Sequence, residues 1–503
     1  MFRIRIACKD TNNSANSLFN LEKLKYVRHL LCFFAYLCTP IMEIAKELTN
    51  KDASFLELGT EPVGRLLVKY ATPAVIAMTA SSLYNIVDAI FIGQGVSALA
   101  IAGISLTFPV MQMTAAFGSM IGVGASTLLS VKLGERDYDF AKRILGNVVV
   151  LNVIMGLVLG VLMLCFIDPI LYFFGATGET LSYARDFMVV ILAGNVVTHL
   201  YFGLNAMLRA ASQPRAAMMA TIYSVVLNVV LCPLFIYAFG WGIRGAALAT
   251  MLSQTAVLMW QFKLFSNRRK FIRFQRGIYR LKARIVKDSF MIGLSPFLIN
   301  LTGCVVAAII NKSLLVYGND LDVASYGICN RFAFFFLMIV MGLNQGMQPI
   351  VGYNYGAKNN ERVKAALVKT IVWATVVVTV GLLVSLIAPR QIVSAFTTDP
   401  YLIEISVHYL FILVCTFPII GFVIVVTNFF QCIGVVKKSI FLSLSRQLIF
   451  LIPAVIVLPR FIGVDGVMWA FPVSDVIATI TAAFLFWAEM RKFKRSQGII
   501  PNS

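Results

Sequence analysis

Charged residues are scarce in this chain. Only 13% of its 503 residues are Asp, Glu, Lys or Arg, whereas a typical soluble domain carries about 25%. Hydrophobic residues make up 59% of the chain, and its mean hydropathy is +0.83. Apolar runs of about twenty residues recur from end to end, which is typical of helices that cross a bilayer. The sequence therefore predicts a polytopic helical membrane protein, with the lipid bilayer as its surroundings.

The chain also lacks the common motifs of ATP-driven and metal-dependent proteins. It contains neither a G-x-x-x-x-G-K-[ST] loop nor an H-E-x-x-H pair. Its 3 histidines are far apart, and its 9 cysteines form no C-x-x-C, so zinc and disulfides are not expected. We expect no cofactor and no metal, and transport work driven by an ion gradient. A membrane-embedded enzyme is the alternative from another class, but the sequence offers no nucleophile or metal cluster for it.

Acidic residues are outnumbered by basic ones, and the net charge is +20. Such an excess can indicate nucleic-acid binding, but here Lys and Arg gather in alternate short loops, as topology signals do. The longest basic segment runs from Lys263 to Lys287, and the opposite loops carry acids such as Asp168 and Asp320. By the positive-inside rule, we expect both termini and this segment in the cytoplasm. The predicted location is the cytoplasmic (inner) membrane, without a nucleic-acid partner.

Twelve membrane spans can be assigned from the apolar runs. The first six are 63–92, 98–130, 141–166, 182–208, 216–239 and 243–265. The second six are 289–316, 324–353, 363–388, 402–431, 438–458 and 465–488. The predicted fold class is an all-α membrane protein with twelve transmembrane helices.

The two halves of the chain resemble each other. A shift of about 222 residues places Gly134-Glu-Arg-Asp over Gly356-Ala-Lys-Asn, and Ser253-Gln over Ser474-Asp. Repeats of this kind predict two pseudo-symmetric six-helix bundles, between which alternating access takes place. The predicted domains are a first lobe at 56–265, a basic linker at 266–287, a second lobe at 288–490 and a cytoplasmic tail at 491–503. We expect residues 1–55 to be a disordered extension or the product of a mis-set start, with Met42 as the alternative start.

One carboxylate lies deep in the first span. Helical spacing at i, i+3, i+4 and i+7 places it on a polar stripe formed by Ser81, Tyr84, Asn85 and Asp88. An acid in a membrane helix is costly unless it faces a polar cavity or a partner, so Asp88 is interpreted as a functional group. Desolvation favours its protonated form, which suits it to load and release a proton or to hold a small cation. The alternative is a structural carboxylate that hydrogen-bonds to neighbouring helices.

Further polar residues inside the spans are candidates for substrate contact. Together with Ser81, Tyr84 and Asn85, they are Gln112, Asn195 and Tyr223. An Asn or Gln in a membrane helix can equally serve to join two helices. Arg446 and Asp475 lie inside the last two spans, where a structural ion pair explains both charges.

Four segments are similar to those of a known family. They read L-Y-N-I-V-D-A-I-F-I-G from Leu83, L-N-V-V-L-C-P-L-F-I-Y from Leu227, G-I-R-G-A-A-L-A-T from Gly242 and N-Q-G-M-Q-P-I-V-G-Y-N-Y-G-A from Asn344. Over residues 58–490 the chain resembles the multidrug and toxic compound extrusion (MATE) transporters of the prokaryotic branch. The resemblance implies two six-helix lobes that export amphipathic, often cationic small molecules by antiport with protons or sodium.

The resemblance also implies an ion-coupling site. In the family, a first-span aspartate works with a fifth-span Asn and Asp and a sixth-span Thr, and these positions fall on Asp88, Asn228, Cys232 and Thr250. Cys232 departs from the pattern, since it replaces the second carboxylate. Sodium prefers several hard oxygen ligands, and a thiol is soft. We therefore expect protons rather than sodium as the coupling ion, with coupling through Asp475 as an alternative.

The predicted function is secondary active multidrug export by a monomer that acts on amphipathic, cationic compounds. The alternative within transport is a flippase or exporter of lipid-linked or polysaccharide precursors. Such a protein is expected to line its cavity with many Arg and Lys for phosphate groups. Few cations are expected to be buried within the spans of this chain, namely Lys312, Arg331 and Arg446, which favours the multidrug exporter.

Overall fold

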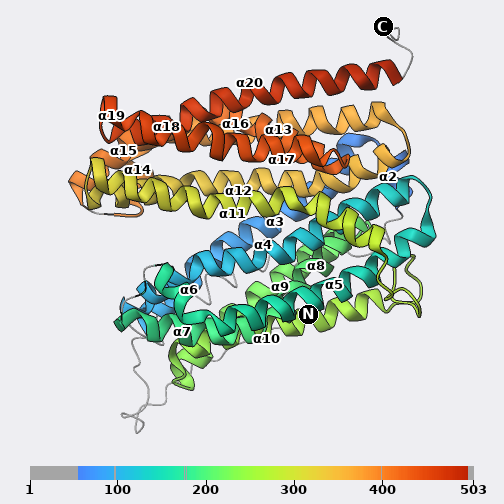
Figure 1. Ribbon diagram of the computed structural model, residues 1–503, viewed down its shortest axis with the longest axis horizontal. Coiled ribbons are helices and arrows are strands. Elements are labelled where there is room, and N and C mark those ends of the chain that lie inside the picture. The colour runs from blue at the N-terminus through green and yellow to red at the C-terminus, as the bar shows by residue number, and fades with distance from the viewer. Residues whose placement is uncertain (1–54, 96–97, 175, 177, 398, 497–503) are drawn as a thin grey trace, which may run out of the picture. The chain divides into compact units, whose positions relative to one another are not determined.

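The computed structural model describes residues 55–95, 98–174, 176, 178–397 and 399–496. Every regular element in this part of the chain is a helix (Figure 1). This is expected of spans in a bilayer, where each backbone polar group must find its partner within the segment. The predictions for residues 1–54 and for the end of the tail, 497–503, lie outside the described residues.

Helices of the first half pack into one bundle, coloured blue to green in Figure 1. They are α2 (Glu57–Thr60), α3 (Val63–Gly95), α4 (Ala98–Gly134), α5 (Tyr138–Cys165), α6 (Ile167–Phe173), α7 (Gly178–Ala193), α8 (Asn195–Ala210), α9 (Pro214–Pro233), the π-helical turn η1 (Leu234–Ala238) and α10 (Gly242–Phe265).

Helices of the second half form another bundle, coloured yellow to red. They are α11 (Ala283–Tyr317), α12 (Asp320–Gly356), α13 (Asn360–Ile387), α14 (Pro389–Ser394), α15 (Pro400–Val414), α16 (Phe417–Cys432), α17 (Val436–Leu444), the π-helical turn η2 (Ser445–Leu451), α18 (Ile452–Val457), α19 (Pro459–Ile462) and α20 (Asp465–Ser496).

Each predicted span falls on one helix or on a run of consecutive helices. Among the described residues, 8 helices are long and apolar enough to cross a membrane, or 10 if each of two bent pairs counts as one span. The bends measure 58° between α7 and α8 and 50° between α15 and α16. The other two predicted spans correspond to α3, with 33 residues, and α10, with 24 residues. The fold is that of a multi-pass, all-α membrane protein.

The two halves cross through a reciprocal pair of glycines. A Cβ on Gly134 would lie 2.0 Å from the carbonyl oxygen of Tyr353, and a Cβ on Gly356 would lie 2.1 Å from that of Val131. Helices α4 and α12 can approach this closely because each presents a glycine, which has no side chain, to the backbone of the other. Each residue of one contact corresponds to one of the other at the offset of about 222 positions, as a pseudo-twofold axis requires.

The seam between the halves continues through further close contacts. A Cβ on Gly124 would lie 1.9 Å from the carbonyl oxygen of Ser289, and one on Gly293 would lie 1.9 Å from that of Met120, so α4 and α11 are in backbone contact. Gly346 is placed in the same way against Ala71, which joins α12 to α3. The first two helices of each half therefore form the seam, and each packs against the opposite half.

Several loops rich in Lys and Arg lie at one end of this seam. We call it the basic end, and it comprises the loops and adjoining helix ends at 132–143, 209–215, 263–287, 358–364 and 433–438. Contacts between the loops hold them together; for example, Lys270 donates to the side chain of Gln213.

The linker between the halves is docked on the first half. The Asn147 side chain donates to the carbonyl oxygens of Ile278 and Arg280, each at 3.2 Å, and accepts from the Lys282 backbone N–H at 2.9 Å. Helix α11 already begins at Ala283, after the extended backbone of Lys282. The end of the predicted linker at 266–287 is therefore helical.

Candidate functional site

The predicted coupling acid belongs to α3. The backbone of this helix is continuous from Val63 to Gly95, with Tyr84, Asn85 and Asp88 inside it. The side chains of residues 83–90 lie outside the described part, so these three residues are placed by their helical backbone alone. Ser81, on the same helix, is half-buried. Helix α3 packs against both α9 and α10, which carry the other predicted coupling residues.

Asn228 of α9 and Thr250 of α10 are brought into direct contact. Asn228 Nδ2 donates a hydrogen bond of 2.8 Å to Thr250 Oγ1, and the Thr250 hydroxyl donates in turn to the carbonyl oxygen of Ala246 at 3.3 Å. Both side chains are buried. A hydrogen bond between two buried polar groups helps to fix the relative positions of their helices, because breaking it costs free energy.

Cys232 follows Asn228 by one helical turn and is fully buried. Pro233 comes next, and since proline has no N–H to donate, the α-helical pattern gives way to the π-helical turn η1. Tyr237 in η1 donates through its hydroxyl to the carbonyl oxygen of Phe91 on α3, at 3.2 Å. This hydrogen bond from η1 joins the fifth span to the first span, about one helical turn beyond Asp88.

The candidate substrate residues divide between several helix pairs. Tyr223 packs edge-on against Trp260, with 5.5 Å between ring centroids, where α9 meets α10. Asn195 is buried and donates to the carbonyl oxygen of Gly156 at 3.1 Å, which joins α8 to α5. Gln112 is half-buried on α4. The Asn195 side chain therefore joins two helices of the first bundle, which is the alternative to substrate contact.

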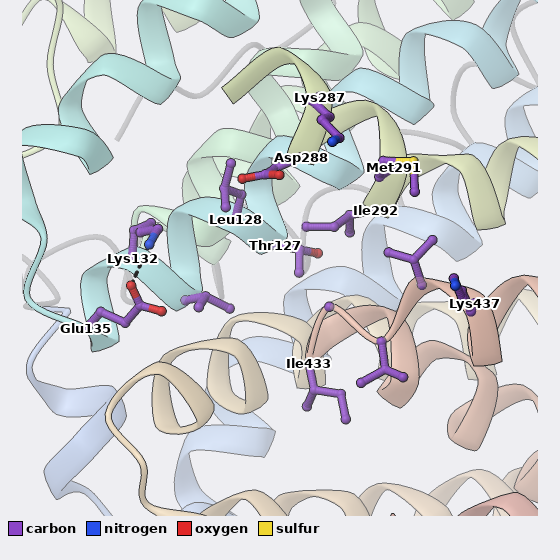
Figure 2. Close-up of a pocket in the computed structure, with 14 residues that line it drawn as sticks. Thr127, Leu128, Lys132, Glu135, Lys287, Asp288, Met291, Ile292, Ile433 and Lys437 are labelled. Carbon is purple, nitrogen blue, oxygen red and sulfur yellow. Dashed lines mark hydrogen bonds and ion pairs between the residues drawn. The ribbon is translucent and has the colours of Figure 1, made fainter. Parts of the chain in front are cut away.

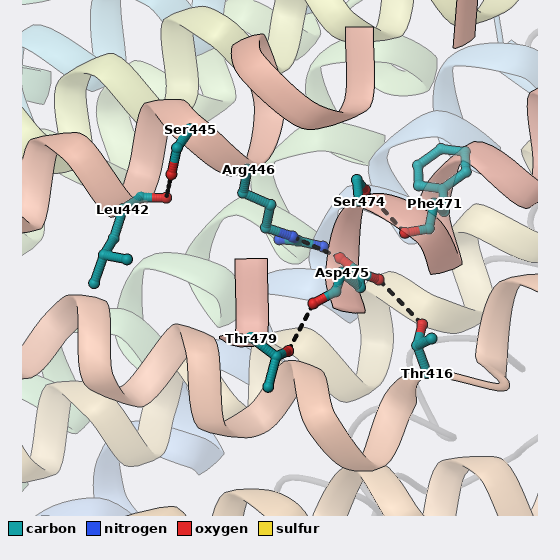
Figure 3. Close-up of polar contacts among 8 residues, drawn as sticks. All are labelled: Thr416, Leu442, Ser445, Arg446, Phe471, Ser474, Asp475 and Thr479. Atoms are coloured by element: carbon teal, nitrogen blue, oxygen red, sulfur yellow. Dashed lines mark hydrogen bonds and ion pairs between the residues drawn. The ribbon is translucent and has the colours of Figure 1, made fainter. Parts of the chain in front are cut away.

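Arg446 and Asp475 meet in the second half, as Figure 3 shows. Arg446 Nε lies 2.8 Å from Asp475 Oδ1, and Thr416 Oγ1 donates to Asp475 Oδ2 at 3.1 Å. Arg446 is in the π-helical turn η2, Asp475 is in α20, and Thr416 is in the break between α15 and α16. Both carboxylate oxygens are therefore engaged, and three spans are tied together at one point.

Two further polar links cross the seam. Gln348 Nε2 donates to Ser126 Oγ at 3.0 Å and to Thr127 Oγ1 at 2.6 Å, which joins α12 to α4. Arg362 of α13 donates to the carbonyl oxygen of Leu58 at 3.1 Å and also to that of Glu61. Gln348 lies within the segment N-Q-G-M-Q-P, a polar run inside an apolar span that could have indicated it. For Arg362, a basic residue in the first turn of α13, no such signal existed.

No group of three or more His, Cys, Asp or Glu side chains suited to a metal ion occurs among the described residues. The contacts described above are instead made by amides, hydroxyls, backbone carbonyl groups and the ion pair of Arg446 with Asp475.

Comparison with known proteins identifies the family. The MatE family model matches residues 73–234 and 294–456, one copy in each half of the chain. The multidrug export protein MepA of Staphylococcus haemolyticus is 28% identical over 438 residues, which cover 87% of this chain and 96% of that protein. MepA of Staphylococcus aureus is 27% identical over 437 residues, with the same shares covered.

Solved structures agree in fold. A multidrug resistance MATE family transporter of the MOP superfamily, in its outward-facing conformation, superposes with a TM-score of 0.82 at 26% identity, covering 89% of this chain and all of that one. A MATE crystal structure in the bent conformation gives a TM-score of 0.83 at 25% identity, with 89% and 100% covered. The chain therefore belongs to the MatE family, whose members are transporters and not enzymes.

Proposed function

We propose that this protein is a secondary active multidrug exporter that exchanges protons for amphipathic, cationic small molecules. The similarity to the MepA multidrug export proteins supports the substrate class. The hydrogen bond between Asn228 and Thr250 carries the assignment of the coupling site, because it sets two of the four family positions side by side next to α3.

In the proposed mechanism, Asp88 carries the proton. Its charged form holds a cationic substrate by direct attraction, and protonation removes that attraction and releases the substrate. Asn228 can donate to a carboxylate or accept from a carboxylic acid, and the Thr250 hydroxyl supports it from α10. Cys232 supplies a thiol where the family pattern has a second acid, so the site is poor in the hard oxygen ligands that sodium requires. Protons are therefore the proposed coupling ion.

Alternating access follows from the two-bundle architecture. The close contacts of the seam join the two bundles at the basic end. Separation of the bundles at this end would open the cavity between them to the side of the membrane that the basic end faces. The proposed lobes are residues 56–265 and 288–490. By the positive-inside rule, the basic end and both termini face the cytoplasm, in a monomer that resides in the cytoplasmic membrane.

The proposal is tested in an efflux-deficient bacterial host. Expression of the chain is expected to raise tolerance to cationic dyes, and Asp88→Asn is expected to abolish the gain without lowering the amount of protein in the membrane. Glu361→Gln, a change of an exposed acid at the basic end, serves as the matched control and is expected to keep the gain. Full resistance with Asp88→Asn would exclude Asp88 as the coupling residue.

The alternative of a flippase for phosphate-bearing precursors receives less support. Its cavity would need free cations, and Arg446 is already paired with Asp475.

A further inference from the structure

A pocket of about 630 Å³ lies in the seam at the basic end (Figure 2). Its walls are the end of α4 from the first half, the first turns of α11, and the turn between α16 and α17. It lies directly on the loop side of the backbone contacts of Gly124 with Ser289 and of Gly293 with Met120. The pocket is therefore the place where α4 and α11 diverge after their closest approach.

Two lysines in the pocket are available to an external anion. Lys287 and Lys437 belong to α11 and α17 and are exposed, and neither forms an ion pair among the described residues. The acids of the pocket are already engaged: Glu135 lies 2.6 Å from Lys132, and Asp288 lies 3.9 Å from Arg284. The unpaired charge at this site is consequently positive.

The start of α17 adds to this preference. Val435 precedes the helix and gives it no side-chain cap, and Val436 and Lys437 of the first turn of α17 line the pocket. Uncapped N–H groups at a helix N-terminus favour an anion. These N–H groups add to the attraction that Lys287 and Lys437 exert on an anion, which is the larger contribution.

Most of the remaining lining residues are apolar. Leu128 of α4, Met291 of α11 and Ile433 of the turn line the same pocket as the charged groups (Figure 2). A small inorganic anion gains nothing from an apolar surface, because it has no apolar groups to bury. An amphiphile gains free energy there by burying its hydrocarbon chains. Basic pockets between transmembrane helices recognise anionic lipid headgroups by this combination.

We propose that this pocket binds one anionic phospholipid, with its phosphate between Lys287 and Lys437 and its acyl chains against Leu128 and Met291. Because the walls come from both halves, the pocket exists only while the halves are closed at the basic end. A bound lipid therefore stabilises this conformation over any in which the halves part there. The binding is independent of the ion that drives transport.

Native mass spectrometry of the full chain in detergent tests the proposal, with phosphatidylglycerol and phosphatidylcholine as probes. We expect phosphatidylglycerol to bind preferentially, and the double variant Lys287→Gln/Lys437→Gln to bind it roughly 30-fold more weakly. The matched control is Lys358→Gln/Lys364→Gln, which removes two exposed lysines of the same end outside the pocket. Met291→Trp fills the pocket without changing its charge and is also expected to weaken binding.

Three outcomes would overturn the proposal. Equal binding of the two lipids would show that the headgroup is not recognised. Equal loss in the control variant would show that general surface charge, and not the pocket, attracts the lipid. Complete competition by inorganic phosphate at low concentration, with Met291→Trp unaffected, would identify a site for small anions.

Discussion

Gly134 and Tyr353 meet where the two halves of the chain cross, and a Cβ on this glycine would lie only 2.0 Å from the tyrosine carbonyl oxygen. Gly134→Val is therefore expected to force α4 and α12 apart at the basic end. The expected cost is about 1–3 kcal/mol of stability, as for other overpacked contacts. Thermal unfolding in detergent and dye transport measure the effect.

The control for this substitution is Gly303→Val, in the middle of α11, where a Cβ meets no atom within 4 Å. It is expected to leave both the melting temperature and transport close to those of the unmodified protein. Equal behaviour of the two variants would contradict a tight seam between α4 and α12.

The hydroxyl of Thr250 is expected to be needed for more than packing. Thr250→Val keeps the shape but removes the acceptor for Asn228, and the loss of one hydrogen bond by a buried amide costs about 0.5–1.5 kcal/mol. Transport is expected to fall strongly, while Thr250→Ser retains most of it. Thr255→Val on the same helix, whose hydroxyl only donates to the carbonyl oxygen of Met251, is the control. A similar loss in both valine variants would argue against a specific role for Thr250.

Cys232 is the residue to which we assign the proposed preference for protons. Cys232→Asp restores a second carboxylate one turn after Asn228, and the added oxygens are expected to make transport respond to sodium. Cys232→Ser, which adds no charge, is expected to stay insensitive to sodium. Dye efflux from proteoliposomes under a sodium gradient, at equal pH on both sides, makes the comparison. Sodium-driven efflux by the unmodified protein would contradict the role given to Cys232.

Substitutions of Arg446 and Asp475 can distinguish a structural role of this ion pair from a role in ion coupling. Asp475→Asn leaves Arg446 without its counter-charge, and breaking such a buried pair costs about 3–5 kcal/mol. The double variant Arg446→Met/Asp475→Leu removes both charges and is expected to recover most of the stability and to retain transport. A stable double variant that no longer transports would favour coupling through Asp475.

Sequence patterns predicted the helices well because long apolar runs are required to cross a bilayer. The similarity of Gly134-Glu-Arg-Asp to Gly356-Ala-Lys-Asn likewise indicated the repeat, since the two glycines occupy equivalent positions in the crossing. The intramembrane charges Arg446 and Asp475 were paired on the sequence because neither is tolerated alone, and the structure places them in contact.

Other features depend on contacts between distant segments and have no local pattern. The π-helical turn η2 carries Arg446 toward Asp475, but its sequence differs little from that of a regular apolar helix. The break before α16 brings Thr416 to the same carboxylate. The hydrogen bonds of Gln348 to α4 arise only once the two halves have packed, so a single helix could not reveal them.

The most direct test of the account measures the pH inside proteoliposomes while a cationic dye is transported. With the unmodified protein, we predict that dye movement is accompanied by proton movement in the opposite direction, with no requirement for sodium. With Asp88→Asn, both movements are predicted to stop together, although the protein remains folded. Proton-coupled transport that survives in Asp88→Asn would contradict the central role of Asp88.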